Sequence, residues 1–192
     1  MYVDILNTDK KYNIIYADPP WRYQDRGCNG ACENHYSTMN IDDICALPVN
    51  DLAASDCVLF LWATYPMLQE AMRVIRSWGF KYKTIAFQWV KLNKNGNGFF
   101  FGLGRWTRGN TEPCLIAIKG NPYQFVKSKG VGQIIQYPLT QHSAKPPIAR
   151  AKIVELMGDI PRIELFARER EAGWDQWGDE APKSYEEVID FD

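Results

Sequence analysis

A single segment, Asn13-Ile14-Ile15-Tyr16-Ala17-Asp18-Pro19-Pro20-Trp21, predicts a buried strand and the chemistry at its end. An apolar run rich in strand-forming residues stops at an acid that two prolines follow. Pro20 forces Pro19 into an extended conformation, and neither proline has a backbone N–H group. The segment after the strand therefore presents carbonyl oxygens beside the Asp18 carboxylate. The carboxyl ends of strands are where α/β proteins bind their ligands.

These groups suit a planar partner that bears an NH2 group. Asp18 and the Pro19 carbonyl oxygen are acceptors, and Trp21 offers a flat apolar face. An exocyclic amine of adenine or cytosine fits, but it is a poor nucleophile because its lone pair is delocalised into the ring. If the two acceptors take its hydrogens, the nitrogen moves toward tetrahedral geometry, and positioning and electrostatics supply most of the rate. The base must be flipped out or single-stranded, and Trp21 would hold it by stacking.

The Asp18-Pro19-Pro20-Trp21 segment resembles the signature of the MT-A70 family of S-adenosylmethionine-dependent adenine-N6 methyltransferases. A proline turn after a strand would explain these four residues alone. Further blocks resemble the family in the family's order and over nearly the whole chain: His35–Met39, Leu59–Trp62, Trp106 with Glu112–Leu115, Lys119–Pro122, His142–Pro146, and Glu164–Arg168 with Gly173-Trp174. The order and coverage make the resemblance specific.

The element pattern predicts one α/β domain over residues 1–192. Strands are predicted at Cys57–Trp62, Thr84–Val90, Cys114–Ile118, Gln133–Tyr137 and Arg162–Phe166. Helices are predicted at Asn40–Ile44 with Asn40 as N-cap, at Pro66–Trp78 with Gly79 as the stop, and at Pro147–Met157 before Gly158. Alternating strands and helices favour a doubly wound sheet. The resemblance implies a Rossmann-like class I methyltransferase fold in the permuted, β-class motif order, with a mostly parallel sheet and helices on both faces.

Two long loops are predicted, at Arg22–Met39 and Leu92–Asn110. The first is expected to order over the site when substrate binds, with disorder as the alternative. It contains Cys28, Cys32 and His35, but a structural zinc site requires four ligands. Reduced thiols are therefore favoured, and no metal is predicted.

Charge and aromatic residues are unevenly distributed. The formal net charge is −1, yet seven cations stand against Glu112 alone between Lys91 and Lys129. Aromatic residues alternate with these cations: Phe99, Phe100, Phe101, Trp106, Tyr123 and Phe125. This composition is typical of a surface that binds phosphates and stacks bases, although a solvated loop with inward-packed aromatics would share it. The resemblance favours nucleic acid.

The sequence also bears on location and cofactor. No apolar run is long enough to cross a membrane, and the first residues lack the features of a signal peptide, so a cytoplasmic protein is expected. No glycine run continues as G-x-G-x-x-G, which leaves a dinucleotide cofactor unsupported.

S-adenosylmethionine is the cofactor that the resemblance implies. Lys145 resembles the family's carboxylate-binding lysine, and Arg168 matches the arginine on the ribose side. Glu164 ends the preceding strand and is expected near the cofactor. Asp179 and Glu180 occupy the family's ribose-contacting positions, with Asp179 in place of the usual asparagine. Any one of these charges taken alone would be interpreted as a solvated surface residue.

The predicted activity is methyl transfer from S-adenosylmethionine to the N6 amine of adenine in DNA. Asp18 and Pro19 would bind the amine, Pro20 would stiffen the segment, and Trp21 and Tyr36 would clamp the flipped base. Asp18 would also accept from the cofactor's own amine. DNA is preferred because a bare catalytic domain resembles the small bacterial and phage members of the family.

Two alternatives stay open. The same chemistry on RNA is the first. The second is a non-catalytic nucleic-acid-binding subunit, since the family includes partners that have lost the acid of the motif. Family members pair through loops like Leu92–Asn110, so a homodimer, a related partner subunit and a monomer are all compatible with the sequence.

Overall fold

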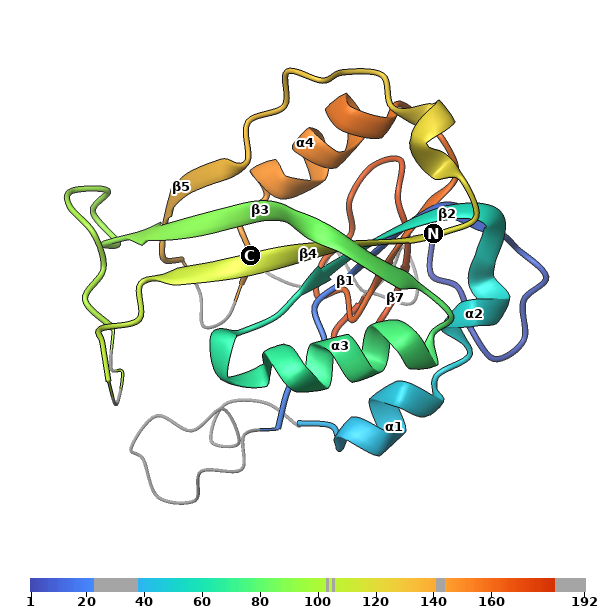
Figure 1. Ribbon diagram of the computed structural model, residues 1–192, viewed down its shortest axis with the longest axis horizontal. Helices are drawn as coiled ribbons and strands as arrows, with labels where there is room; N and C mark the ends of the chain where they lie inside the picture. Colours follow the sequence, from blue (N-terminus) through green and yellow to red (C-terminus); the bar gives the residue numbers. More distant parts are fainter. Residues whose placement is uncertain (23–37, 103, 105, 141–143, 182–192) are drawn as a thin grey trace, which may run out of the picture.

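The computed structural model describes residues 1–22, 38–102, 104, 106–140 and 144–181. These residues form a seven-stranded sheet with the strand order β5-β3-β4-β2-β1-β6-β7 (Figure 1). The strands are β1 (Tyr12–Ala17), β2 (Ala53–Trp62), β3 (Lys81–Leu92), β4 (Thr111–Lys119), β5 (Ile134–Pro138), β6 (Arg162–Leu165) and β7 (Asp175–Trp177). Four of the six described strand pairs are parallel, and the pairs β2–β4 and β3–β4 are antiparallel.

Helices cover both faces of this sheet, as Figure 1 shows. One face carries α1 (Ile41–Ala46), α2 (Val49–Leu52) and α3 (Leu68–Ser77), and the other carries α4 (Ile148–Met157). Two short 3-10 turns, η2 (Tyr65–Met67) and η3 (Pro122–Phe125), complete the described helical elements. The predicted fold class, a mostly parallel sheet between helices, is confirmed.

Side-chain alternation along β1 explains the two layers. Ile15 and Ala17 pack in the cluster under α1, α2 and α3, whereas Ile14 and Tyr16 pack in the cluster under α4. Successive residues of a strand point to opposite faces, so a strand that is apolar at every position must be covered on both sides. The unbroken apolar run before Asp18 therefore requires helices on both faces.

The predicted helix boundaries rest on local signals that the structure retains. The Asn40 side chain accepts a hydrogen bond from the Asp42 backbone N–H and caps α1. Gly79 and Gly158 follow α3 and α4 with φ angles of 79° and 86°, positive values that glycine adopts without the strain a Cβ atom would cause. Among the described residues, no helix combines the length and apolarity needed to span a lipid bilayer.

Strand β7 was not predicted, because three residues are too short for a periodic pattern. Asp175 ties β7 to the start of β1 across the intervening β6: its carboxylate accepts from the Tyr12 hydroxyl at 2.8 Å and from the Lys10 ammonium at 2.9 Å. Burial alone would raise the pKa of Asp175, but these donors outweigh it and lower the pKa below the ordinary value of 3.8.

An Asp175→Asn variant tests this anchor. A carboxyl group with a lowered folded pKa stabilises the fold above its unfolded pKa, and this stabilisation is lost as the pH falls through the folded value. Urea midpoints measured from about pH 5 to about pH 3 should therefore fall more steeply for the wild type than for Asp175→Asn. Parallel pH profiles of the two proteins would contradict the assignment.

Candidate active site

The strand directions bring the predicted site residues to one edge of the sheet. The strands β1, β2, β3, β5, β6 and β7 all have their carboxyl ends at this edge, and the antiparallel β4 begins there. Asp18 follows β1, Glu112 lies at the start of β4, Lys145 lies in the segment after β5, and Arg168 follows β6. Residues that are far apart in the sequence thus meet at the end of the sheet where α/β proteins bind ligands.

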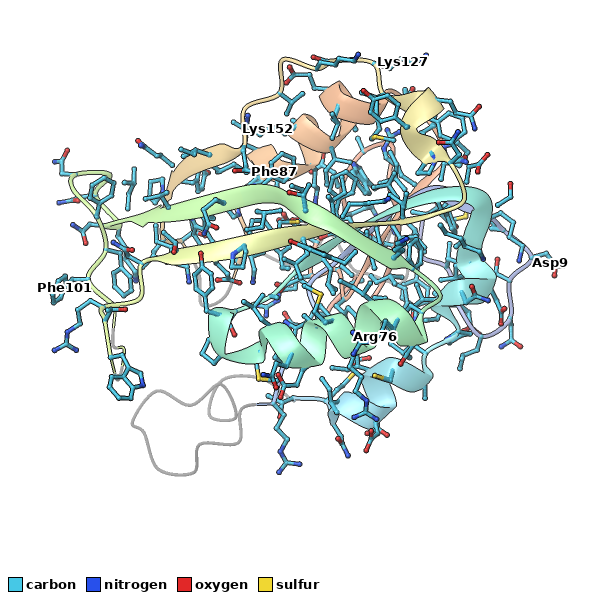
Figure 2. All side chains as sticks on the ribbon, viewed as in Figure 1. Asp9, Arg76, Phe87, Phe101, Lys127 and Lys152 are labelled. Carbon is cyan, nitrogen blue, oxygen red and sulfur yellow. The ribbon has the colours of Figure 1, made fainter. Side chains whose placement is uncertain are left out.

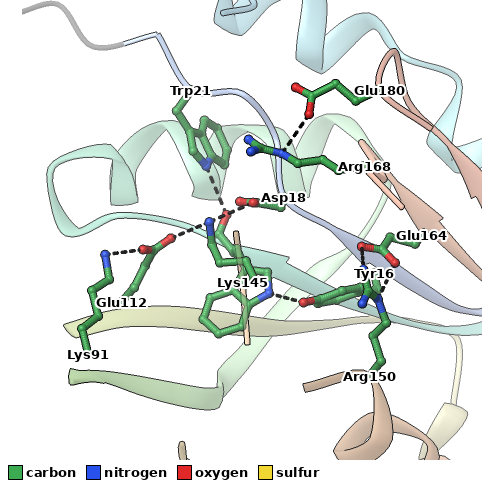
Figure 3. A network of polar contacts seen from close by, with 11 residues as sticks. Tyr16, Asp18, Trp21, Lys91, Glu112, Lys145, Arg150, Glu164, Arg168 and Glu180 are labelled. Atoms are coloured by element: carbon green, nitrogen blue, oxygen red, sulfur yellow. Dashed lines mark hydrogen bonds and ion pairs between the residues drawn. The ribbon is translucent and has the colours of Figure 1, made fainter. Parts of the chain in front are cut away.

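Four charged side chains form a row at this edge, with alternating sign (Figure 3). The Lys145 Nζ lies 2.8 Å from Asp18 Oδ2 and 3.0 Å from Glu112 Oε1. The other Glu112 oxygen, Oε2, lies 2.9 Å from Lys91 Nζ. The side chains of Lys145 and Glu112 are both 8% exposed, and the Lys145 ammonium also lies 5.8 Å from the centroid of the Trp62 ring. We call Asp18, Lys145, Glu112 and Lys91 the charge row.

Burial and neighbouring charges oppose each other within the charge row. Burial raises the pKa of Asp18, and the Lys145 ammonium reduces this shift. Burial would lower the pKa of Lys145, but the carboxylates of Asp18 and Glu112 outweigh it and raise the pKa. The pKa of Glu112 is lowered because the two ammonium groups outweigh its burial. We assign Lys145 as a cation and both acids as carboxylates at neutral pH, so each charge is compensated inside the protein.

The proline segment is held by backbone hydrogen bonds. The Pro19 carbonyl oxygen accepts from the Trp21 backbone N–H at 2.8 Å, and the Pro20 carbonyl oxygen accepts from Met39 at 3.0 Å. A carbonyl oxygen has two lone pairs. The Pro19 oxygen therefore retains acceptor capacity beside the Asp18 carboxylate.

Trp21 is an anchor in this structure. Its side chain is 4% exposed and packs in the apolar cluster under α1 and α3, and its Nε1 donates to the Trp62 carbonyl oxygen at 3.2 Å. Trp62 is fixed in turn, because its own Nε1 donates to the Tyr16 hydroxyl at 2.6 Å. Stacking on a substrate base requires an exposed ring face, which Trp21 does not present in this structure, so its predicted stacking stays a prediction. The ring secures the segment that carries Asp18.

A cavity of about 330 Å³ opens at the same edge of the sheet. Its size lies within the range of small-molecule sites. Five residues predicted for the site line it: Asp18, Pro20, Arg168, Asp179 and Glu180. The other described lining residues are Met39, Leu47, Phe166, Ala167, Trp177 and Gly178.

The turns after β6 and β7 shape one wall of the cavity. Phe166 has a φ angle of 61°, which is unfavourable for a bulky residue, and its ring meets Trp177 edge to face with 5.4 Å between centroids. Gly178 packs against the backbone after β6, where a Cβ atom would lie 2.5 Å from the Ala167 carbonyl oxygen. Arg168 Nε lies 3.7 Å from Glu180 Oε2 (Figure 3). The two turns therefore hold aromatic and charged side chains around one space.

Glu164 does not line this cavity. Its carboxylate accepts two hydrogen bonds from Arg150 of α4, at 2.7 Å from Nε and 3.0 Å from Nη2. Burial raises the pKa of Glu164, and Arg150 reduces the shift. The structure thus places this residue where it joins α4 to β6, and its predicted position near the cofactor stays a prediction.

Several predicted residues lie outside the described part of the chain. Tyr36 is one, and so are the three potential zinc ligands Cys28, Cys32 and His35. Within residues that the structure describes, no group of three or more His, Cys, Asp or Glu side chains is arranged to hold a metal ion.

Sequence reasoning missed the role of Glu112 in the charge row and the part of Trp177 in the aromatic wall. Glu112 was visible as the one acid within a basic stretch, and a lone acid among cations signals an ion pair. Phe166 was visible as the last residue of the strand predicted at Arg162–Phe166, at the ligand-binding edge. Trp177 gave no signal, because it ends the strand that the pattern did not predict.

Comparison with known proteins agrees with this geometry. The family model described as MT-A70 matches residues 12–180. The chain is 34% identical to the Type II methyltransferase M.MunI of Mycoplasma sp, over 93% of this chain and 82% of that protein. It is 29% identical to the human N(6)-adenine-specific methyltransferase METTL4 and 31% identical to the Arabidopsis thaliana N(6)-adenosine-methyltransferase MT-A70-like, but it spans only 39% and 24% of their lengths. The chain therefore belongs to the MT-A70 family.

Proposed function

We propose that this protein transfers a methyl group from S-adenosylmethionine to the N6 amine of adenine in DNA. The observation that carries the proposal is the position of Asp18, which belongs both to the charge row and to the cavity lining. One carboxylate can therefore contact a bound cofactor and an amine that enters beside the proline segment. The names of the matched relatives support adenine N6 as the acceptor.

The cavity fits this cofactor in its charge and its walls. Among the described residues that line it, Asp18, Asp179 and Glu180 are acidic and Arg168 is basic, so the lining is net negative. S-adenosylmethionine supplies an electrophilic methyl group on a sulfonium cation, which a negative lining favours. Asp179 and Glu180 would accept from the ribose hydroxyls, and the aromatic wall of Phe166 and Trp177 suits a purine ring.

Asp18 and Pro19 would act on the substrate amine. The ion pair with Lys145 uses Asp18 Oδ2, so we assign the amine contact to Oδ1 and to the Pro19 carbonyl oxygen. Two acceptors fix the orientation of the NH2 group and draw its lone pair out of conjugation. Lys145 would hold the cofactor's carboxylate by exchanging one of its two carboxylate partners.

DNA is the preferred substrate because of the names of the matched relatives. M.MunI is named a Type II methyltransferase and METTL4 is named N(6)-adenine-specific, whereas other matched relatives are named N(6)-adenosine-methyltransferases. We treat residues 1–192 as one catalytic domain. RNA is the competing substrate within the same chemistry.

The test is methyl transfer from labelled S-adenosylmethionine to matched single-stranded DNA, duplex DNA and RNA, with the product nucleosides identified by mass spectrometry. N6-methyldeoxyadenosine is the expected product. N6-methyladenosine formed in RNA alone would refute DNA as the substrate but leave the proposed mechanism intact. Absence of transfer despite cofactor binding would favour a binding subunit or a missing partner.

A Gly178→Ala variant probes the cavity wall. The added Cβ would overlap the Ala167 carbonyl oxygen, so the turn that carries Asp179 and Glu180 must move. Overpacking of this kind costs about 1–3 kcal/mol in unfolding free energy, and the displaced turn should bind S-adenosylhomocysteine more weakly. Urea unfolding and calorimetry measure the two effects. Unchanged affinity in a destabilised Gly178→Ala protein would separate this turn from the cofactor site.

A further inference from the structure

The connection between β3 and β4 projects from the sheet and exposes large aromatic side chains. We call the described residues 93–102, 104 and 106–110 the finger; it lies at the left end of Figure 1, where β3 ends and β4 begins. Phe99 is 59% exposed, Phe101 is 74% exposed and Trp106 is 95% exposed. Figure 2 shows Phe101 at the outer margin of the molecule. Exposed aromatic side chains gathered in one segment mark an interaction surface.

Glycines make the finger narrow. A Cβ atom at Gly102 would lie 2.0 Å from the Gly109 carbonyl oxygen, and one at Gly104 would lie 1.7 Å from the Thr107 carbonyl oxygen. The two arms therefore approach each other at backbone distance, which glycine alone permits. Trp106 lies in the sequence between Gly104 and Thr107, whose close approach forms the end of the finger.

All charged residues in the sequence of the finger are cations. No Asp or Glu occurs between Lys91 and Asn110. Among the described residues, Lys94 and Arg108 are exposed cations, and the Arg108 guanidinium lies 5.5 Å from the Phe101 ring centroid. Cations interleaved with exposed aromatic rings complement a polymer that carries phosphates and stacked bases. A protein surface that excludes water would instead require an apolar patch with few charges at its centre.

The finger lies at the same edge of the sheet as the candidate active site. Its first residues follow Lys91, which belongs to the charge row, and the Phe100 N–H donates to the Lys91 carbonyl oxygen at 2.8 Å. The other aromatic part of the basic stretch is elsewhere. Tyr123 follows the far end of β4, about 26 Å away at the usual rise per residue of a strand. The stretch predicted as one nucleic-acid surface is therefore divided between opposite edges of the sheet.

We propose that the finger binds the DNA substrate, with Trp106 stacking on a base and Arg108 contacting the phosphate backbone. This inference rests on the proposed function and adds the element that holds the strand around the target adenine. A narrow finger with a ring at its end can enter the base stack. Because the base to be methylated must leave that stack, an inserted ring would occupy the space it vacates.

Fluorescence anisotropy with a fluorescein-labelled duplex and its separated strand tests the proposal. One base stacked on an aromatic ring changes the dissociation constant by about 5- to 150-fold, so Trp106→Ala should weaken binding within that range at every salt concentration. Arg108→Ala should reduce the slope of log affinity against log salt by about 1, because one phosphate contact is lost. Tyr123→Ala is the matched control. Tyr123 is 66% exposed and its ring centroid lies 5.9 Å from the Lys129 ammonium, yet this variant should bind within about twofold of the wild type.

The outcomes separate this inference from the proposed function. If Trp106→Ala binds DNA with the same affinity as the wild type, the finger does not bind the substrate as proposed. Normal methyl transfer by the same variant would leave the proposed activity intact. If the wild type binds DNA through Trp106 but transfers no methyl group, the proposed activity is refuted and DNA binding by the finger is supported. If Trp106→Ala sediments differently from the wild type but binds DNA equally well, the finger belongs to a protein interface. Failure of the wild type to bind DNA would also refute the proposal.

Discussion

Asp18→Asn is expected to lower the single-turnover rate of methyl transfer by about 10²- to 10³-fold at saturating cofactor. The variant keeps the shape of the side chain but loses the charge and one acceptor, so the substrate amine stays conjugated with its ring. Lys145 keeps Glu112 as a partner, which limits the loss of unfolding free energy to about 1–3 kcal/mol. Quenched-flow transfer assays on protein shown by circular dichroism to be folded measure the effect.

The control for this variant is Asp43→Asn. Asp43 is an exposed carboxylate in the first turn of α1, so its removal changes net charge equally without touching the site. It should leave the transfer rate within about twofold of the wild type. Appreciable turnover by Asp18→Asn would remove the mechanism proposed for this carboxylate.

Lys145→Met is expected to have the largest effect on stability, with a loss of about 3–5 kcal/mol in unfolding free energy. Methionine retains the apolar stem but removes the ammonium that lies between Asp18 and Glu112, so two carboxylates remain near each other at a largely buried position. Loss of one charged hydrogen bond should also lower the affinity for S-adenosylhomocysteine by about 10- to 150-fold. Urea unfolding and calorimetry measure the two losses, and Lys152→Met on α4 is the control.

A double variant shows whether the loss comes from an uncompensated charge. Asp18→Asn combined with Lys145→Met removes both members of the pair and leaves Glu112 with Lys91. Its unfolding free energy should be higher, by about 0.5–3 kcal/mol, than the value obtained by subtracting both single losses from that of the wild type, whereas transfer should stay absent. Additive losses of stability would mean that Asp18 and Lys145 act independently.

Much of the fold could be predicted because the informative segments are either apolar at every position or bounded by glycine and proline. The run before Asp18 and the glycines after α3 and α4 fix a strand and two helix ends locally. The direction of β4 could not be predicted, since antiparallel pairing with β2 and β3 depends on contacts across the sheet. Family and fold class are confirmed, while the roles of individual site residues stay predictions.

The site was less accessible to sequence reasoning where a residue type allows two uses. Trp21 has an aromatic face that suits a base, whereas its burial and its hydrogen bond to the Trp62 carbonyl oxygen suit an anchor. Glu164 and Arg168 lie four residues apart, but one faces α4 and the other the cavity. Such choices depend on which side of the sheet a residue faces and on what covers it there.

The backbone of Phe166 has a consequence for how this position evolves. A left-handed conformation costs a residue with a Cβ about 1–2 kcal/mol, and the edge-to-face contact with Trp177 returns about 0.5–1.5 kcal/mol. Glycine would avoid the first term, but it would forgo the second term and also the packing of the partly buried ring against the core cluster. Selection for folding alone therefore favours an apolar ring here despite the strained backbone, and a lineage that replaced Phe166 by glycine would lose core packing together with one wall of the cavity.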